Sequence, residues 1–313
     1  MKKLRVGHLS TFYHTAVLLM AGGNLSGELG TVVEWRLFGT GPAIVDAFER
    51  GELDLAYIGL PPAIIGMGRG VGIVCIAGGH IEGTVISAGE QYRGTPDTSE
   101  LGEILGQFSG RGVGVPGKGS IHDVILRECL ERFGLEDEVR VVNFAWADQV
   151  LEALVRGEVA AAVGTPALAV AVRRYAGGKI LYPPSLLWPS NPSYGILADK
   201  VLLKEEGHIV EQFLLLHEQA TAFFRERPAE AAKLISAYVG FVDDEFVLDS
   251  LRVSPKYCAQ ITGEYIASTM EFVEILKRLG YIGRRLSSSE IFDLSLIRKT
   301  HPGKDHYSEG IRA

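Results

Sequence analysis

The sequence has 313 residues, of which 47% are apolar and 22% are charged, with a net charge of −7. That length accommodates two packed units of common domain size, and the composition is typical of a globular protein. The charge is spread along the chain with no stripe of Lys and Arg, so neither nucleic acid nor an anionic membrane is the expected partner. No segment approaches the roughly 20 apolar residues that a membrane-spanning helix needs.

The N-terminus superficially resembles a secretory leader, because Met1-Lys2-Lys3 is followed by the apolar run 16–23. The polar stretch 10–15 separates the two, and the run is short and lacks a small-x-small cleavage pattern. We therefore expect Leu4–Leu9 to be the first buried strand and the printed chain to carry no leader. This leaves two locations open: extracytoplasmic if a leader was removed, and cytoplasmic if the printed start is the native one.

Three cysteines, Cys75, Cys129 and Cys258, stand in no disulfide or metal-binding spacing. The eight histidines are scattered, and no sequence motif of a hydrolase or metalloenzyme occurs. We therefore predict no metal, no cofactor and no catalytic residues.

Short β-rich runs alternate with helical patterns in the first part of the chain. The expected strands are 4–10, 32–38, 53–59, 72–78 and 84–89. Helical spacing appears at 15–23 and 41–51, and the second of these ends at a glycine suited to a helix C-terminus. This rhythm predicts an α/β fold with a mainly parallel sheet and helices on both faces.

The pattern restarts after a polar connection at 90–103. Strands are expected at 112–116, 139–144 and 159–165, with helices at 120–135 and 147–157. The Pro- and Ser-rich stretch 182–195 reads as a second crossing, followed by a return strand at 194–199. Three or four amphipathic helices are expected between 206 and 293, and the polar tail from Arg298 is expected to fray.

One stretch is nearly repeated: residues 47–63 read AFERGELDLAYIGLPPA, and residues 153–169 read ALVRGEVAAAVGTPALA. In each copy Arg-Gly-Glu is expected to end a helix and start a strand, and Gly-x-Pro to end that strand. Ligands gather at the carboxyl ends of strands in parallel α/β sheets. The repeat therefore predicts two lobes whose strand ends face each other across one cleft.

These segments, together with 4–21 and 110–135, resemble the successive blocks of type II solute-binding proteins. The closest branch is the nitrate/sulfonate/taurine group, which also holds binders of thiamine-pyrimidine precursors. The resemblance covers residues 4–200 and implies a monomeric two-lobed protein that closes on a small ligand and delivers it to an ABC permease. The ligand implied is anionic or heterocyclic: a sulfonate, a nitrate-like ion, a carboxylate or a pyrimidine precursor.

The same scaffold also hosts cytoplasmic enzymes, and this alternative stays open. Two are similar in outline, the pyrimidine synthase of thiamine biosynthesis and the chorismate dehydratase-like enzymes. The chain lacks the clustered cysteines of the first and the opening block of the second.

The expected domain division follows from the restart and the return strand. Lobe 1 is predicted to comprise 1–90 and 193–313, and lobe 2 to be one continuous insert at 91–192. The hinge crossings are expected near 88–92 and 188–194.

Candidate ligand contacts on lobe 1 follow its strands. Ser10, Thr11 and His14 come after the first strand, where hydroxyls either cap a helix or donate to an anion. Gly39-Thr40 precedes Gly41-Pro42 at the next helix start, and Gly59 and Pro61 form a rigid shelf that is a binding wall or a structural turn.

The strongest local signal lies on lobe 2, at Lys118-Gly119-Ser120. The surrounding glycines imitate a nucleotide-binding loop but lie inside the predicted strand, so that motif is rejected. A helix start with a lysine and a hydroxyl favours a carboxylate, sulfonate or similar oxyanion.

The remaining candidates follow later strands or lie in the second crossing. Asp148 is expected simply to cap the helix after Trp146. Trp188 and Tyr194 stack on a planar ligand or pack the hinge. The other ligand contacts expected here are Thr165 and Asn191.

Overall fold

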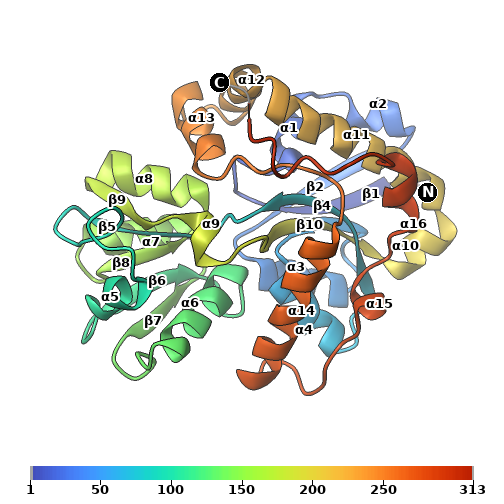
Figure 1. The fold of residues 1–313 in the computed structure, drawn as a ribbon. Helices are drawn as coiled ribbons and strands as arrows, with labels where there is room; N and C mark the ends of the chain where they lie inside the picture. The colour runs from blue at the N-terminus through green and yellow to red at the C-terminus, as the bar shows by residue number, and fades with distance from the viewer. Residues whose placement is uncertain (1–2, 312–313) are drawn as a thin grey trace.

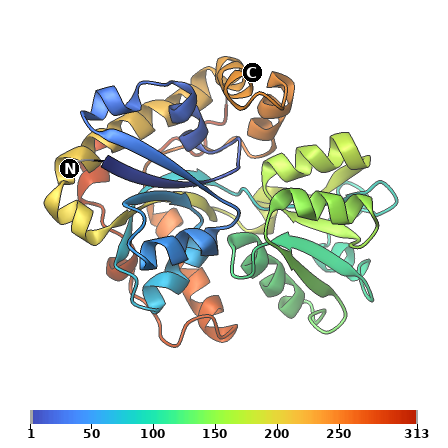
Figure 2. The same ribbon diagram turned by 180° about the vertical axis from the view of Figure 1, so that it is seen from behind.

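The computed structural model describes residues 3–311, which form two five-stranded sheets flanked by helices (Figure 1). The first sheet runs in the order β2 (Val32–Phe38), β1 (Lys3–Leu9), β3 (Leu55–Ile58), β10 (Pro192–Asp199), β4 (Ile73–Ile81). The second runs β7 (Arg140–Phe144), β6 (Gly112–Pro116), β8 (Ala161–Gly164), β5 (Val85–Gly89), β9 (Gly178–Tyr182). Figure 2 shows the two sheets side by side from behind, and we call each sheet with its flanking helices a lobe.

The two sheets have the same topology. In the first, β1 pairs in parallel with β2 and β3, while β10 is antiparallel to both neighbours, β3 and β4. In the second, β6 pairs in parallel with β7 and β8, while β5 is antiparallel to β8 and β9. In each sheet the antiparallel strand is the first one that the chain forms after it arrives from the other sheet. The prediction of an α/β fold with mainly parallel sheets is confirmed.

Helices cover both faces of each sheet, which is why the strands read as nearly continuous apolar runs. The helices of the first lobe's strand–helix units are α1 (Thr15–Ala21), α2 (Leu25–Leu29), α3 (Gly41–Glu49) and α4 (Leu60–Gly68). Those of the second lobe are α5 (Leu101–Gly106), α6 (Ile121–Arg132), α7 (Ala147–Val155), α8 (Pro166–Ala176) and α9 (Pro184–Leu187). Alternation along β3 shows the two faces: Leu55 and Tyr57 pack with α1 and the C-terminal helices, whereas Ala56 and Ile58 pack with α3 and α4.

The repeated stretches adopt the same helix–strand–helix unit. Gly51 and Gly157 follow α3 and α7 with φ of 67° and 72°, the left-handed conformation that glycine adopts without strain. Each strand that follows leads directly into a further helix, α4 or α8, which the sequence analysis did not foresee. The expected shelf at Pro61 is therefore the first turn of α4, where prolines are tolerated because the missing N–H has no helical partner.

The chain changes sheet earlier than expected. Strand β4 ends at Ile81 in the first sheet and β5 begins at Val85 in the second, so the predicted crossing near 88–92 lies too far along the chain. The return falls between β9, which ends at Tyr182, and β10, which begins at Pro192. The strand β9 and helix α9 occupy part of the stretch that was expected to be a crossing. The lobe boundaries and the single insert stay predictions, which this order of strands supports.

Beyond β10 the chain is helical, as expected. The helices are α10 (Lys200–Glu205), α11 (Gly207–Glu226), α12 (Pro228–Val239), α13 (Asp244–Val253), α14 (Gly263–Arg278), α15 (Ser288–Ile291) and α16 (Ser295–Thr300). They also reach the second lobe: Arg173 and Arg174 of α8 pair with Asp249 and Asp243 of α13, and Arg278 of α14 pairs with Glu128 of α6.

The tail does not fray where the structure describes it. His301 and Tyr307 are buried, and the Tyr307 hydroxyl donates to the carbonyl oxygens of Cys258 and Gln260 at 2.8 and 2.9 Å. The expectation of a loose tail was wrong because these two side chains find a buried surface that a polar composition does not reveal.

Candidate functional site

A small cavity lies between the carboxyl ends of the two sheets, where the repeat predicted a cleft. Its volume is about 50 Å³, enough for a few water-sized groups. It is bordered by the first residues or N-caps of six helices, α1, α3, α4, α6, α7 and α8, namely His14, Thr40, Gly59, Ser120, Ala147 and Thr165. They converge because each helix in a strand–helix unit starts at the carboxyl end of its strand.

The convergence creates a positive potential without any cationic side chain. Each helix N-terminus carries unpaired N–H groups and roughly half a positive charge. Among the cavity-lining residues of the described chain, none is Lys, Arg, Asp or Glu. The polar groups offered by side chains are hydroxyls and imidazoles.

The first wall of the cavity comprises Ser10, Thr11, His14, Thr40 and Gly59. Thr40 Oγ1 caps α3 by accepting the N–H of Ala43 at 3.4 Å, whereas two other polar groups of this wall have no partners among the described residues. Thr11 and His14 are 5% and 1% exposed, and neither Thr11 Oγ1 nor His14 Nδ1 has a hydrogen-bond partner among the described residues. The N-cap of α1 is His14, and no side chain caps this helix. Capping by Ser10 or Thr11 is therefore wrong, and a buried hydroxyl without a partner calls for another explanation.

The second wall, Ser120, His122 and Thr165, is satisfied internally. Ser120 Oγ donates to the carbonyl oxygen of Pro116 at 2.6 Å and accepts the N–H of Asp123 at 3.2 Å. Thr165 Oγ1 accepts the N–H of Leu168 at 3.2 Å, and His122 Nδ1 lies 2.9 Å from Thr84 Oγ1. These side chains border the cavity while serving as caps and anchors of their own lobe.

The two lobes touch at glycines around the cavity. A Cβ on Gly39 would lie 2.5 Å from the carbonyl oxygen of Ala145 and 2.9 Å from the Trp146 ring. A Cβ on Gly117 would lie 2.8 Å from the side chain of Thr40 across the cleft. We expected the glycines at 39–41 to let a ligand approach the backbone. At Gly39 the missing side chain instead makes room for Ala145 and Trp146 of the other lobe. The structure is accordingly a closed form.

Lys118 and Gly119 do not reach this cavity, contrary to prediction. Lys118 is exposed and both residues line a separate recess with Arg69 and Tyr281. The Gly119 N–H donates instead to the buried carboxylate of Asp123 at 2.8 Å, and the Tyr281 hydroxyl donates to the same oxygen at 2.8 Å. The anion that the helix start attracts is therefore a side chain of α6 itself.

Four other predicted contacts lie outside the cavity: Pro61, Trp188, Asn191 and Tyr194. Trp188 stacks on Phe272 with ring centroids 4.5 Å apart and donates through Nε1 to Ser268. Asn191 donates through Nδ2 to the Trp188 carbonyl oxygen at 2.7 Å. Pro61 is buried within α4. These groups are packing elements of the first lobe and the return crossing.

Tyr194 supports the wall from behind. Its hydroxyl accepts the N–H of Thr15 at 3.3 Å, and its ring centroid lies 4.1 Å from that of His14. The predicted cap at Asp148 was wrong: Trp146 occupies the N-cap position, and Gln149 Oε1 accepts the N–H groups of Ala145 and Trp146.

Burial keeps the histidines of the site neutral. It lowers the pKa of His122 to about 4, and it holds the pKa of His14 well below its ordinary value, with a smaller contribution from His80. A neutral imidazole offers one donor and one acceptor, so these rings present hydrogen-bonding groups rather than charges.

Several lining residues were not predicted from the sequence, of which Tyr13, His122 and Ser193 carry polar side chains. His122 follows the N-cap Ser120 by two positions, so the helix start that we singled out contained the signal. Ser193 Oγ accepts the N–H of Gly83, which lies in the other crossing segment. That contact joins the two crossings and has no sequence pattern.

A larger groove of about 650 Å³ lies at the opposite edge of the second sheet, near Arg111 and Arg140. Both side chains are exposed, and the groove is at the amino ends of β6 and β7. The smaller cavity is the better candidate because the strand ends, helix starts and buried unpartnered groups meet there.

The comparisons with known proteins agree with this architecture. Among the described residues, no helix combines the length and apolar character required to cross a membrane. A putative binding protein of Brucella abortus is 24% identical over 241 residues, which cover 75% of this chain and 71% of that protein.

Two solved structures share the fold. The alkanesulfonate-binding protein SsuA from Xanthomonas axonopodis, bound to MOPS, matches with a TM-score of 0.80 and 17% identity, over 93% of this chain and 98% of that one. The periplasmic nitrate-binding protein NrtA from Synechocystis matches with a TM-score of 0.78 and 16% identity, over 100% and 91%.

Residues 1–239 match the model of the NMT1-like family, which is more than half of the chain. The resemblance read from the sequence blocks is thereby confirmed. The chain belongs to the NMT1-like family and has the type II fold of the nitrate- and sulfonate-type solute-binding proteins.

Proposed function

We propose that this protein is the solute-binding component of an ABC importer and that it captures a small oxyanion, such as a nitrate-like ion, a sulfonate or a carboxylate, between its lobes. The observation that carries the proposal is the convergence of six helix N-termini on a buried cavity with no charged side chain in its lining. Oriented N–H groups and dipoles stabilise an anion without the side-chain entropy cost of a lysine.

The first wall supplies the side-chain contacts in this proposal. Thr11 Oγ1 and His14 Nδ1 are buried without partners in the described chain, so a ligand that satisfies them gains binding free energy without breaking internal hydrogen bonds. Among the described lining residues there is no cysteine, lysine or carboxylate, and the hydrogen bonds of the structure join none of the lining hydroxyls to a lining imidazole as a nucleophile and its base. Binding is therefore favoured over the enzymatic alternatives.

The delivery partner in this proposal is an ABC permease, and the site of action is extracytoplasmic. The named relatives support this. One is a putative binding protein, one similar fold is an alkanesulfonate-binding protein, and another is a periplasmic nitrate-binding protein.

A thermal-shift screen tests the proposal. The panel contains nitrate, sulfate, alkanesulfonates, short carboxylates and aminopyrimidines, with titration calorimetry for every hit. A ligand at about 100 times its dissociation constant adds roughly 2.7 kcal/mol, which raises the melting temperature of a chain of this size by about 4 °C. Stabilisation only by pyrimidines, or by none of the panel, would contradict the oxyanion assignment.

The Lys118→Met substitution distinguishes binding in the cavity between the lobes from binding at Lys118-Gly119-Ser120, the helix start that the sequence favoured. Because Lys118 is exposed and faces another recess, we expect the affinity for the hit to change by no more than about twofold. A tenfold loss would place the anion at Lys118 and overturn the cavity described above.

A further inference from the structure

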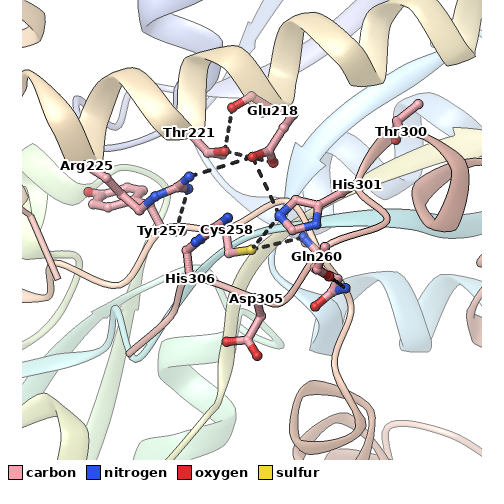
Figure 3. A network of polar contacts seen from close by, with 12 residues as sticks. Glu218, Thr221, Arg225, Tyr257, Cys258, Gln260, Thr300, His301, Asp305 and His306 are labelled. Atoms are coloured by element: carbon pink, nitrogen blue, oxygen red, sulfur yellow. Dashed lines mark hydrogen bonds and ion pairs between the residues drawn. The ribbon is translucent and has the colours of Figure 1, made fainter. Parts of the chain in front are cut away.

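A second cluster of polar side chains lies on the first lobe, away from the cavity, where the C-terminal tail crosses α11 (Figure 3). Glu218 projects from α11, His301 follows α16, and His306 lies further along the tail. One ligand-type atom of each of these three residues lies within 4.8 Å of the others. Cys258, in the loop between α13 and α14, adjoins His301.

The separations in this cluster are too long for strong hydrogen bonds and suit ligands of one ion. His301 Nε2 lies 3.6 Å from Glu218 Oε1 and 3.5 Å from Cys258 Sγ. Metal–ligand distances of about 2.0 Å for nitrogen and oxygen and about 2.3 Å for sulfur place tetrahedral ligands about 3.3–3.6 Å apart. Glu218 and Cys258 therefore stand around His301 Nε2 at about the spacing of tetrahedral ligands, and His306 offers a further ligand atom within 4.8 Å of those of Glu218 and His301.

Thr221 Oγ1 donates to Glu218 Oε2 at 3.2 Å, so Oε1 is the oxygen of this carboxylate that faces His301 (Figure 3). Arg225 Nη1 donates to the Tyr257 carbonyl oxygen, and Arg225 Nη2 stands 3.7 Å from Glu218 Oε1, beyond ordinary hydrogen-bond range. His301 is 5% exposed, and its Nδ1 has no partner among the described residues.

Two further contacts resemble the outer partners of metal ligands. His306 Nδ1 lies 2.8 Å from Glu309 Oε1, and a carboxylate at one ring nitrogen orients the other nitrogen toward a metal. The Gln260 N–H points to Cys258 Sγ at 3.4 Å and would stabilise a metal-bound thiolate, whereas without metal burial raises the pKa of the Cys258 thiol to about 11. Glu218, Glu309 and a Cys258 thiolate together outweigh the positive charge of Arg225.

We propose that this cluster binds one transition-metal ion, Zn²⁺ by the chemistry of its nitrogen, sulfur and oxygen donors, and so fastens the tail to α11. Three of its ligands are Glu218, His301 and His306, and the fourth is Cys258, which adjoins His301 and moves toward the ion when it binds. Binding exchanges the thiol proton for the metal ion, and that proton passes to solvent. The tail is already seated next to the cluster by the Tyr307 hydroxyl, which holds the Cys258 carbonyl oxygen at 2.8 Å.

The test uses the full chain, stripped of metal with a chelator and then titrated with Zn²⁺ by calorimetry and with Co²⁺ by absorption. We expect one equivalent of Zn²⁺ per chain and, with Co²⁺, a thiolate-to-metal charge-transfer band together with the strong visible bands of tetrahedral coordination. His306→Gln should weaken Zn²⁺ binding at least about tenfold. Its side chain is 30% exposed, so this variant is expected to fold.

The matched control is His208→Gln, because this imidazole is on α11 but its side chain is 78% exposed. It should leave Zn²⁺ affinity unchanged. Cys258→Ser should abolish the charge-transfer band and weaken binding. The proposal is overturned if no stoichiometric site is found, if the two histidine variants bind alike, or if the Co²⁺ complex shows no thiolate band.

Discussion

The two walls of the cavity are built by the same strand–helix units, yet they use their polar groups differently. On the first wall, Thr11 Oγ1 and His14 Nδ1 are buried without partners in the described chain. On the second, Ser120 and Thr165 hydroxyls are engaged as helix caps and His122 is held by Thr84. We infer that the first wall supplies ligand contacts and the second supplies a rigid surface that closes on them.

The difference arises from how each helix begins. A side-chain oxygen at the N-cap accepts the free N–H groups of the first turn, and this occupies the hydroxyl. Thr165 and Ser120 on the second wall stand at that position, as does Thr40 on the first, whereas Thr11 lies three residues before the N-cap of α1. A hydroxyl that is buried near a helix start without capping it remains available to a ligand.

Lowering the pH is expected to have the largest effect, because it acts on buried histidines at both walls of the cavity. Burial lowers the pKa of His122 in the second wall to about 4, and that of His217, behind the first wall, to about 4. Below pH 6.5 these histidines bind protons in the unfolded chain but not in the folded chain. The free energy of unfolding is therefore highest above pH 6.5 and falls as the pH is lowered toward 4. Each histidine accounts for about 3 kcal/mol over this window.

Urea unfolding followed by circular dichroism at several pH values measures this loss. His122→Gln should remove the part of the pH-dependent loss of unfolding free energy that His122 causes. His208→Gln, at an exposed histidine, should leave the pH dependence unchanged. An unfolding free energy that stays constant from pH 7 to 4.5 would show that these imidazoles are not buried neutral groups.

Gly39→Val breaks the contact between the walls. Its side chain would collide with the Ala145 carbonyl oxygen and the Trp146 ring, so the closed form becomes rare. If closure is a hundredfold less populated, the affinity for the ligand falls by about a hundredfold. Small-angle scattering should show a larger radius of gyration with ligand present. Gly106→Val, where an added Cβ has open space, serves as the control; equal affinity of the two variants would refute this role of Gly39.

Thr11→Val tests the first wall with little change in volume. Removing a hydroxyl that binds the ligand costs about 1–3 kcal/mol, or roughly a tenfold or greater loss of affinity. Without ligand, the variant should melt no lower than the natural protein, because the lost group has no internal partner in the described chain. Calorimetry and thermal melting separate the two effects, and a lower melting temperature without ligand would contradict them.

Thr165→Val is the corresponding substitution on the second wall, and we expect it to have the smallest effect. Loss of the cap on α8 should reduce the free energy of unfolding by about 1 kcal/mol. Because the hydroxyl serves its own helix, we expect ligand affinity to change by no more than about threefold. A large loss of affinity with unchanged stability would mean that the second wall also contacts the ligand through its side chains.

The sequence by itself located most strands of the two sheets and the edge at which the cleft lies, although helices α4 and α8 and strand β9 were not predicted. Apolar periodicity and turn residues located the strands, the repeat at 47–63 and 153–169 identified equivalent units, and the strand-end rule indicated the cavity edge. These signals are local, since Gly51 and Gly157 need left-handed backbone wherever the rest of the chain lies.

Only the tertiary structure decided which side chains face the cavity. Lys118 and Ser120 are two residues apart, yet Lys118 is exposed outside the cavity, and the Ser120 hydroxyl donates a hydrogen bond to the Pro116 carbonyl oxygen. Asp123 takes the Gly119 N–H that an anionic ligand was expected to occupy. Such competition between a ligand and internal hydrogen bonds depends on distances of a few tenths of an ångström. Spacing along a chain cannot carry that information, nor could it bring Glu218, Cys258 and His301 together from segments about 40 residues apart.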